Sequence, residues 1–407
     1  MIIGRSSIFW ISIMIAVLAF GLMLIYFIVF GDIMKSISAQ LFYGGKFNSF
    51  FATRAFFVLL LGIATFPLII KKEIQELKIA SIILFIGISS FLLILTGEMI
   101  FEGNFENHDE SYDEYFIVDR DLTVVKGLSM ILVAFSFQQN LFPLYNGLAV
   151  QTAENCLDAV KYALWSTGII YIMIALLGIF FFGSVIEDNI LQNVSYESNW
   201  ESFVLRIIFC IVLACHIPFI FFVGKESVLI IIDEMQRKSI SKALEAKLLE
   251  QSSIRTESTQ GLYVGGGLEF GVNDSTSTNP DINAQLEEAD NTRRRQSLAY
   301  KEMPYFNYFL STVILFGAEL IFSIIIKDIG LIFEFISALA ISSIAFVFPG
   351  VFYLMAEAKF ASSLTALQNK SVRMQAYGFI ILGILAFLFQ ITANIVEIIE
   401  DLEHEKS

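Results

Sequence analysis

Three amide side chains stand next to one another, three residues before a proline, inside a long apolar run. Gln138, Gln139 and Asn140 precede Pro143 in the segment FSFQQNLFPLYNGL, residues 135–148. Amides both donate and accept hydrogen bonds, and a proline breaks a helix because it removes a backbone donor. Irregular backbone inside a membrane survives only where it is buried in protein or lines a water-filled cavity. If the run crosses a membrane, it therefore predicts a helix broken at Pro143, with amides that line a polar cavity or hydrogen-bond neighbouring helices.

The composition places the chain in a membrane. Of its 407 residues, 56% are hydrophobic and only 16% are charged, far from the balance of a soluble domain. A helix needs about 20 mostly apolar residues to cross the hydrocarbon core. Nine runs qualify, which predicts an all-α membrane protein with about nine transmembrane helices: 7–30, 54–71, 79–98, 127–147, 162–183, 203–223, 305–326, 330–355 and 376–397.

The positive charges predict the orientation of these helices. A cytosolic N-terminus places most of the 26 Lys and Arg residues in the inner loops, where membrane proteins concentrate them. The same orientation puts Asn193, in the acceptor sequence Asn193-Val194-Ser195, in the outer loop 184–202. An acceptor on that side can be glycosylated, so Asn193 is the predicted glycosylation site.

A long polar interruption divides the chain into three parts. We expect six helices in 1–223, a cytosolic loop in 224–304, and three helices with an acidic C-terminal tail in 305–407. The interruption separates two groups of apolar runs without itself containing a run long enough to cross the membrane.

The cytosolic loop changes composition along its length. Residues 224–250 carry apolar side chains at helical spacing, which predicts an amphipathic helix lying on the inner membrane surface. Residues 251–300 are polar and rich in Gly and Ser, which predicts disorder. The basic run before Ser297 could direct a kinase to that serine, or it could face lipid headgroups.

Several classes of protein are excluded by what the chain lacks. A net charge of -14 argues against a nucleic-acid partner, and the three cysteines do not have the spacing of a disulfide framework or a metal site. The sequence contains no catalytic dyad, nucleotide loop or cofactor motif. We therefore expect neither an enzyme nor a bound cofactor.

The segment of amides and proline resembles the sixth-helix pattern of the amino acid/auxin permease family, which includes the system A and system N neutral amino acid transporters. Other segments are similar to the family's third helix, to the join of its fourth and fifth, to its seventh and to its tenth, in the order the family has them. The matches in the sixth-helix pattern are Gln139, Asn140, Pro143, Tyr145, Asn146 and Leu148, and the other segments are 25–32, 65–81, 171–193 and 348–357.

The resemblance implies a leucine-transporter-like fold, in which two inverted five-helix repeats enclose a central amino acid site. It also implies transport by alternating access, coupled to protons or to sodium. The chain begins at the loop before the family's third helix, so we expect it to lack the first two family helices. The residues implied to bind substrate line the break in the sixth helix: Ser136, Phe137, Gln138, Gln139 and Asn140.

Departures from the family pattern bear on the coupling ion. Gln138 stands where the pattern has His, and Gly147 where it has Glu. The run 203–223, similar to the family's eighth helix, contains no Ser or Thr, although sodium-coupled relatives supply a hydroxyl ligand there. A hard cation requires oxygen ligands, so we expect proton coupling rather than sodium coupling.

Four ionisable side chains lie within the apolar runs: Arg206, His216, Glu319 and Glu334. Because a charge at mid-bilayer costs at least about 2.5 kcal/mol, each needs a partner or a role. His216 is the first proton-coupling candidate, since imidazole titrates near neutral pH, and Glu319 is the second. The alternatives are structural: His216 could hydrogen-bond a neighbouring helix, and Glu319 could pair with Arg206. Glu334 could reach the surface or line the pathway.

The sequence thus predicts a secondary active, proton-coupled amino acid transporter, with an amino acid, protons and the lipid bilayer as its partners. We expect it in the plasma membrane or in a vacuolar or lysosomal membrane. The alternative is a non-transporting amino acid sensor or regulatory paralogue that signals through the loop 224–304. The missing family helices motivate this alternative, because they would supply part of the substrate site.

Overall fold

The chain is helical in the computed structural model, and its helices match the predicted runs. The structure describes residues 6–42, 53–70, 78–102, 123–138, 141, 145, 152–182, 200–236, 305–326, 328–360 and 370–404. Within these residues there is no strand, and α12, η8 and α13 follow one another without a gap. The helices are α1 (Ser6–Phe42), α2 (Arg54–Ile69), α3 (Lys78–Glu102), α4 (Thr123–Ala134), α6 (Ala153–Phe182), α8 (Trp200–Gln236), α11 (Tyr305–Ile325), α12 (Ile329–Ile336), η8 (Ser337–Val347), α13 (Phe348–Phe360) and α14 (Lys370–His404).

The predicted class of an all-α membrane protein is confirmed. In the described part of the chain, 6 segments are long and apolar enough to cross a membrane: α1, α6, α8, α11, the continuous segment from α12 to α13, and α14. A seventh apolar helix, α2, has 16 residues. The protein is therefore a multi-pass membrane protein. The inverted repeat remains a prediction.

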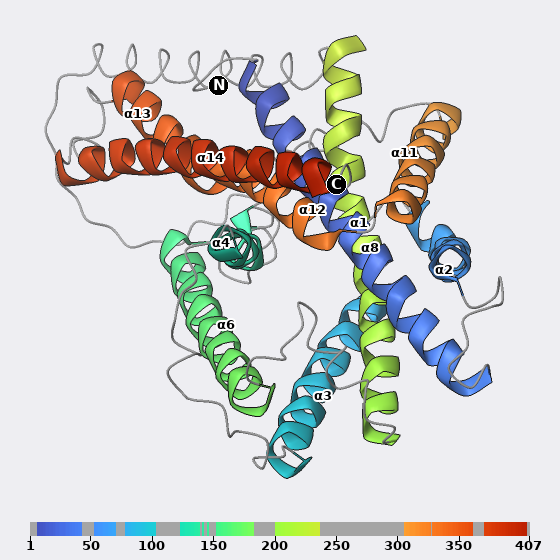
Figure 1. Ribbon diagram of the computed structural model, residues 1–407. Coiled ribbons are helices and arrows are strands. Elements are labelled where there is room, and N and C mark those ends of the chain that lie inside the picture. Colours follow the sequence, from blue (N-terminus) through green and yellow to red (C-terminus); the bar gives the residue numbers. More distant parts are fainter. Residues whose placement is uncertain are drawn as a thin grey trace, which may run out of the picture.

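Two 37-residue helices, α1 and α8, form the centre of the molecule. Figure 1 shows them crossing, with α2 and α11 on one side and α4 and α6 on the other. Met23 and Phe27 of α1 pack with Ile217 and Phe221 of α8 in a fully buried cluster. The two backbones approach closely at Gly224, where a Cβ would lie 2.8 Å from Ala19 Cβ. Only glycine fits that crossing without a shift of one helix.

A second core joins α1 to the segment from α12 to η8. Leu18 and Ile25 of α1 pack against Ile336 and Ile341, and Val133 of α4 completes the cluster. In η8 the helix widens to π-helical turns, and Ser342 Oγ donates to the carbonyl oxygen of Ser337 at 3.0 Å, five residues earlier. π-Helical turns of this kind are rare and occur mostly at functional sites.

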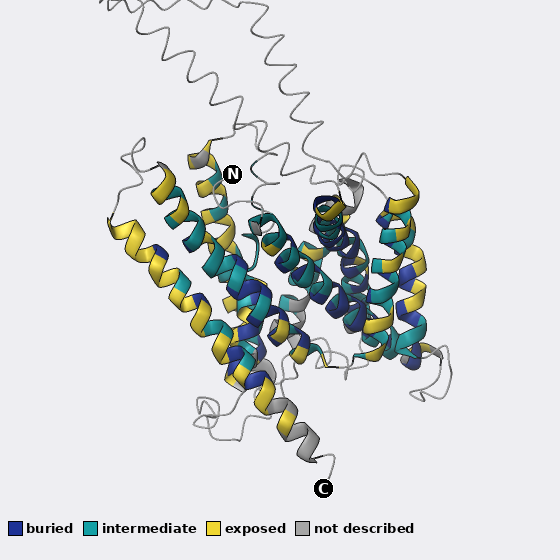
Figure 2. Ribbon diagram, turned by 90° about the horizontal axis from the view of Figure 1, so that it is seen from above, coloured by how far each residue is buried: buried dark blue, intermediate teal, exposed yellow. Residues whose placement is uncertain are grey.

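The outer helices expose their apolar side chains. Figure 2 shows α6 and α14 exposed along much of their length, whereas the central helices are buried. Trp165 and Ile172 on α6 are 69% and 63% exposed, and Leu385 on α14 is 58% exposed. Apolar faces of this extent suit contact with lipid rather than with water.

The helix that begins at Trp200 extends beyond the predicted end of its span. The boundary expected between the sixth helix and the cytosolic loop, at 223, falls inside α8, which continues to Gln236. Lys225 explains why the helix stays within the bundle, because it is 2% exposed and donates to Ile69 O at 2.7 Å and to Tyr308 Oη at 2.6 Å. Its ammonium group also lies 4.9 Å from the centroid of the Tyr308 ring. A buried ammonium group with these partners keeps a polar stretch inside the bundle.

Candidate functional site

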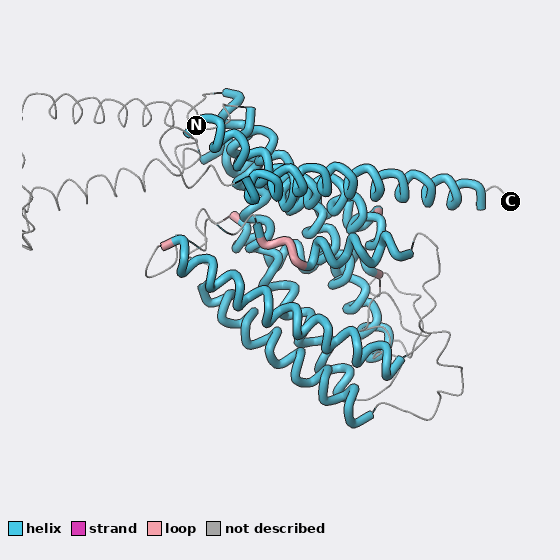
Figure 3. Tube along the Cα trace, turned by 90° about the vertical axis from the view of Figure 1, so that its left-hand side faces the viewer, coloured by secondary structure: helices cyan, strands magenta, loops and turns pink. Residues whose placement is uncertain are grey.

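The described residues contain a helix break just before the amides. α4 ends at Ala134, and Ser136 and Phe137 have irregular backbone. Figure 3 shows that the described chain is helical apart from a few short loop segments. Ser136 accounts for the early end, because its hydroxyl donates to Val133 O at 2.6 Å and its amide to the same oxygen at 3.0 Å. A serine that bonds the backbone three residues back competes with the helical pattern. Pro143 itself lies outside the described residues, so the predicted break at that residue stays a prediction.

The break opens onto a cavity of about 370 Å³ between α4 and α6. This volume lies in the range of small-molecule sites. The cavity is largely apolar, with the Thr167 hydroxyl and the Cys156 thiol as its polar side-chain groups. Its lining residues are Ala134, Phe135, Phe137, Cys156, Ala159, Val160, Ala163, Leu164 and Thr167.

Hydrogen-bond acceptors lie at the C-terminal end of α4 and just after it. The carbonyl oxygens at the C-terminus of a helix carry partial negative charge, and α4 ends here at Ala134. Gln138 lies just beyond, and its Oε1 is buried and has no hydrogen-bond partner among the described residues. A buried acceptor without a donor is costly, so the site favours a ligand that brings donors, such as an ammonium group.

A tyrosine on α6 holds the end of α4. The hydroxyl of Tyr171 donates to the carbonyl oxygen of Ala134 at 3.4 Å, and its ring packs edge-on against Phe135 with centroids 5.3 Å apart. Sequence reasoning did not identify Tyr171 as a site residue. The signal was available, because a tyrosine in an apolar span usually has a hydrogen-bond partner for its hydroxyl group.

Tyr26 connects His216 to the core beside the break. The ring of Tyr26 on α1 packs against the imidazole of His216 on α8, with centroids 5.1 Å apart. Tyr26 also packs against the core cluster that contains Val133 of α4, one residue before the end of that helix.

The chain matches the family described as transmembrane amino acid transporter protein over residues 1–396. It belongs to that family. The prediction of a transporter family rather than an enzyme is thereby confirmed. The chain is 22% identical over 184 residues to vacuolar amino acid transporter 7 of Saccharomyces cerevisiae, covering 44% of this chain and 35% of that protein. It is 23% identical over 207 residues to vacuolar amino acid transporter 5 of Schizosaccharomyces pombe, covering 50% of this chain and 48% of that protein. These matches span less than half the length of each relative.

The expected pair of Arg206 and Glu319 does not form in this family member. Arg206 Nη1 donates to Ser36 Oγ at 3.3 Å, near the end of α1. Glu319 instead lines a cavity bounded by α1 residues as far along as Leu24. Leu24 and Ser36 are about 18 Å apart along the helix at 1.5 Å per residue. Of the alternatives for Glu319, the pair with Arg206 is therefore wrong, because the two side chains meet different parts of α1.

Glu334 does not reach the surface, which was one of its two predicted places. It is 2% exposed and faces α14. With its amide nitrogen turned toward the carboxylate, Asn394 donates to Glu334 Oε2 and also to Gln390 O at 3.1 Å. Gln390 donates to Ser337 Oγ at 3.1 Å. These polar groups join α12 and η8 to α14 inside the bundle.

Other predicted site residues lie outside the described residues. Of the predicted substrate contacts, Ser136, Phe137 and Gln138 are placed at the break, and Gln139 and Asn140 are not described. The glycosylation site Asn193 and the kinase site Ser297 also fall outside. The structure therefore places three of the predicted substrate contacts at the break, whereas His216 lies between α8 and α1 and Glu319 lines a separate cavity.

Proposed function

We propose that this member of the transmembrane amino acid transporter family carries neutral amino acids across a membrane and binds them at the break after α4. The observation that carries the proposal is the buried Gln138 Oε1, which has no hydrogen-bond partner among the described residues and follows Phe137 of the lining of a cavity of about 370 Å³. The amino group of the substrate would donate to these acceptors. The apolar lining of the cavity suits an uncharged side chain.

We propose that protons drive this transport and that His216 couples them to the substrate site. His216 packs against Tyr26, and Tyr26 packs against the core cluster that contains Val133, near the end of α4. A change in the charge of the imidazole can therefore act on the substrate site through packed side chains. Tyr26 is the titratable side chain in ring contact with the imidazole, and Cys215 precedes His216 in the sequence. Glu319 lines a different cavity, so His216 is the better placed of the two candidates.

The proposed location is the vacuolar membrane or an equivalent acidic compartment. Both relatives carry the name vacuolar amino acid transporter. An acidic lumen would supply the proton gradient that the proposed mechanism uses.

Flux measurements on the full chain in proteoliposomes test the proposal. Radiolabelled leucine is offered under a pH gradient or a sodium gradient, with lysine and glutamate as charged comparisons. We expect leucine to accumulate under the pH gradient and not under the sodium gradient, and the charged amino acids to be excluded. Equal accumulation under both gradients would overturn proton coupling, and no leucine flux under either would overturn transport.

A further inference from the structure

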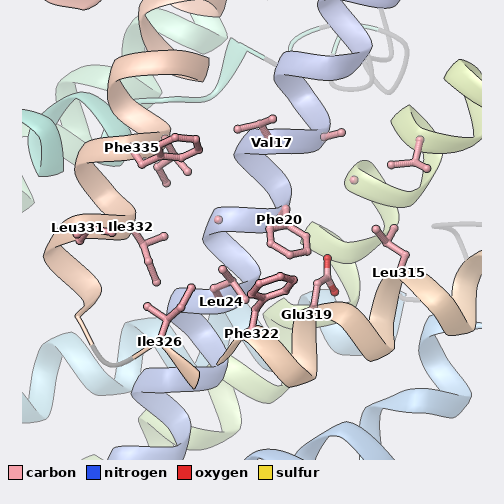
Figure 4. A pocket seen from close by; sticks show the side chains of 15 residues that line it. Val17, Phe20, Leu24, Leu315, Glu319, Phe322, Ile326, Leu331, Ile332 and Phe335 are labelled. Carbon is pink, nitrogen blue, oxygen red and sulfur yellow. The ribbon is translucent and has the colours of Figure 1, made fainter. Parts of the chain in front are cut away.

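A second cavity, separate from the break after α4, lies among α1, α8, α11 and α12 (Figure 4). Its volume is about 440 Å³, and its walls are almost entirely apolar. Aromatic rings from three helices take part, namely Phe20 of α1, Phe322 of α11 and Phe335 of α12. The cavity has the size of a small-molecule site, and neither the substrate nor the proton route proposed above uses it.

One of the side chains that line this apolar cavity carries a carboxyl group. Figure 4 shows the Glu319 side chain extending from α11 toward α1, beside Phe20. Glu319 is 2% exposed, and its Oε2 has no hydrogen-bond partner within the described part of the chain. A buried carboxylate without a partner carries a large desolvation cost, which a bound cation would offset.

The lysine and the arginine of α8 are engaged elsewhere. Lys225 follows Gly224 of the lining, but its ammonium group bonds Ile69 O and Tyr308 Oη. Arg206 bonds Ser36 at the far end of α1. Among the described residues that line the cavity there is no Lys, Arg or His. A bound ligand could therefore supply the cation that pairs with the Glu319 carboxylate.

The apolar walls and the single carboxyl group limit the chemical classes of ligand that fit this cavity. A metal ion needs several oxygen, nitrogen or sulfur ligands, and the described residues contain no group of three His, Cys, Asp or Glu that could hold one. An amino acid zwitterion would place its own carboxylate against apolar walls that offer it no side-chain cation. An amine with an apolar body and no acid group meets both conditions.

The ligand can enter from the bilayer. Phe335 and Phe322 are 50% and 46% exposed, and both lie on helices that are long and apolar enough to span the membrane. The cavity wall therefore includes side chains that are partly exposed on membrane-spanning segments, where an amphipathic molecule in the bilayer can reach them.

We propose that this cavity binds a lipophilic amine in its protonated form, with the ammonium group against the Glu319 carboxylate and the apolar body along Phe20, Phe322 and Phe335. The ring of Phe20 can add a cation–π contact to the ion pair. This binding is independent of the transport proposal, since the two cavities share none of their lining residues.

Binding of dodecylamine to the full chain in lipid nanodiscs tests this inference. Dodecanol is the uncharged comparison with the same tail. We expect dodecylamine to raise the thermal unfolding midpoint in a saturable manner, dodecanol to do so much less, and Glu319→Gln to weaken dodecylamine binding by at least about tenfold. Glu357→Gln, on α13 and paired with Arg373 at 3.7 Å, is the control and should bind dodecylamine normally.

A second variant keeps the test decisive if Glu319→Gln does not fold. Ala16→Leu adds volume to the cavity wall and leaves the carboxyl group in place. It should also weaken dodecylamine binding several-fold. Equal binding of dodecanol and dodecylamine, or unchanged dodecylamine binding in both variants, would overturn the proposal.

Discussion

The imidazole of His216 on α8 packs against the phenol ring of Tyr26 on α1, with ring centroids 5.1 Å apart. This contact lies between the two longest helices, which form the core of the molecule. Tyr26 also packs against the core cluster that contains Val133, near the end of α4, where the substrate is proposed to bind. The contact thus joins a residue that can change charge to the core beside the proposed site.

Replacing His216 tests its proposed role in coupling. His216→Gln retains hydrogen-bonding capacity but loses the charge change near neutral pH. We expect leucine accumulation under a pH gradient to fall at least about tenfold, while exchange of leucine across the membrane without a gradient persists. Cys215→Ser, at the neighbouring position, is the control and should keep both activities. Loss of exchange together with accumulation would show that His216 is needed for binding or folding instead.

Removal of the Tyr171 hydroxyl tests the attachment of α4. Tyr171→Phe keeps the ring against Phe135 but removes the hydrogen bond to Ala134 O. Because such a bond contributes roughly 0.5 to 1.5 kcal/mol, we expect the apparent affinity for leucine to fall by about two- to tenfold. Tyr162→Phe is the matched control, since Tyr162 lies on the same helix and is 75% exposed. An equal effect of both substitutions on leucine affinity would contradict the role of Tyr171.

A methyl group at Gly224 tests the crossing of α1 and α8. A Cβ there would lie 2.8 Å from Ala19 Cβ, so Gly224→Ala forces the helices apart. We expect a loss of about 1 to 3 kcal/mol in stability, measured as a lower thermal unfolding midpoint in detergent. Gly317→Ala, where a Cβ meets nothing within 4 Å, should leave the midpoint unchanged or raise it slightly. A midpoint of Gly224→Ala at or above that of the unmodified protein would show that the crossing tolerates more volume.

Loss of the Lys225 ammonium group tests what keeps the end of α8 inside the bundle. Lys225→Met retains an apolar chain but removes the hydrogen bonds to Ile69 O and Tyr308 Oη. We expect a destabilisation of about 2 to 4 kcal/mol, seen as a lower unfolding midpoint, because charge-assisted bonds are replaced by orphaned acceptors. Lys161→Met, at an exposed position on α6, should have little effect. Equal midpoints for the two variants would mean that the Lys225 contacts contribute nothing net.

The apolar pattern predicted where helices lie better than where they end. The runs 7–30 and 203–223 both became longer helices, to Phe42 and Gln236. Hydropathy reports the length that can lie in hydrocarbon, whereas helix length also depends on polar residues that find partners inside the bundle. Lys225 is the clearest case, because its partners Ile69 and Tyr308 come from distant parts of the sequence.

The candidate substrate site was predicted only in part, because its contacts also join residues from distant parts of the sequence. The amides and proline indicated a broken helix, and the structure shows a break just before them, where Ser136 bonds Val133 O. The contact of Tyr26 with His216 and the bond of Tyr171 to Ala134 O could not be found from sequence, because each depends on how two helices meet. Likewise, the apolar cavity around Glu319 is formed by four helices, and no local pattern indicates it.

Protection of a cysteine at the break by substrate tests the central claim most directly. Ser136→Cys is introduced in a chain whose native Cys156, Cys210 and Cys215 are replaced by alanine, and its rate of modification by a small maleimide is measured in proteoliposomes. Ser166→Cys, at an exposed position on α6, is the control. If the break binds an amino acid, leucine slows modification of Cys at 136 in a saturable manner and leaves position 166 unaffected. Modification of position 136 at the same rate with and without saturating leucine would contradict the account.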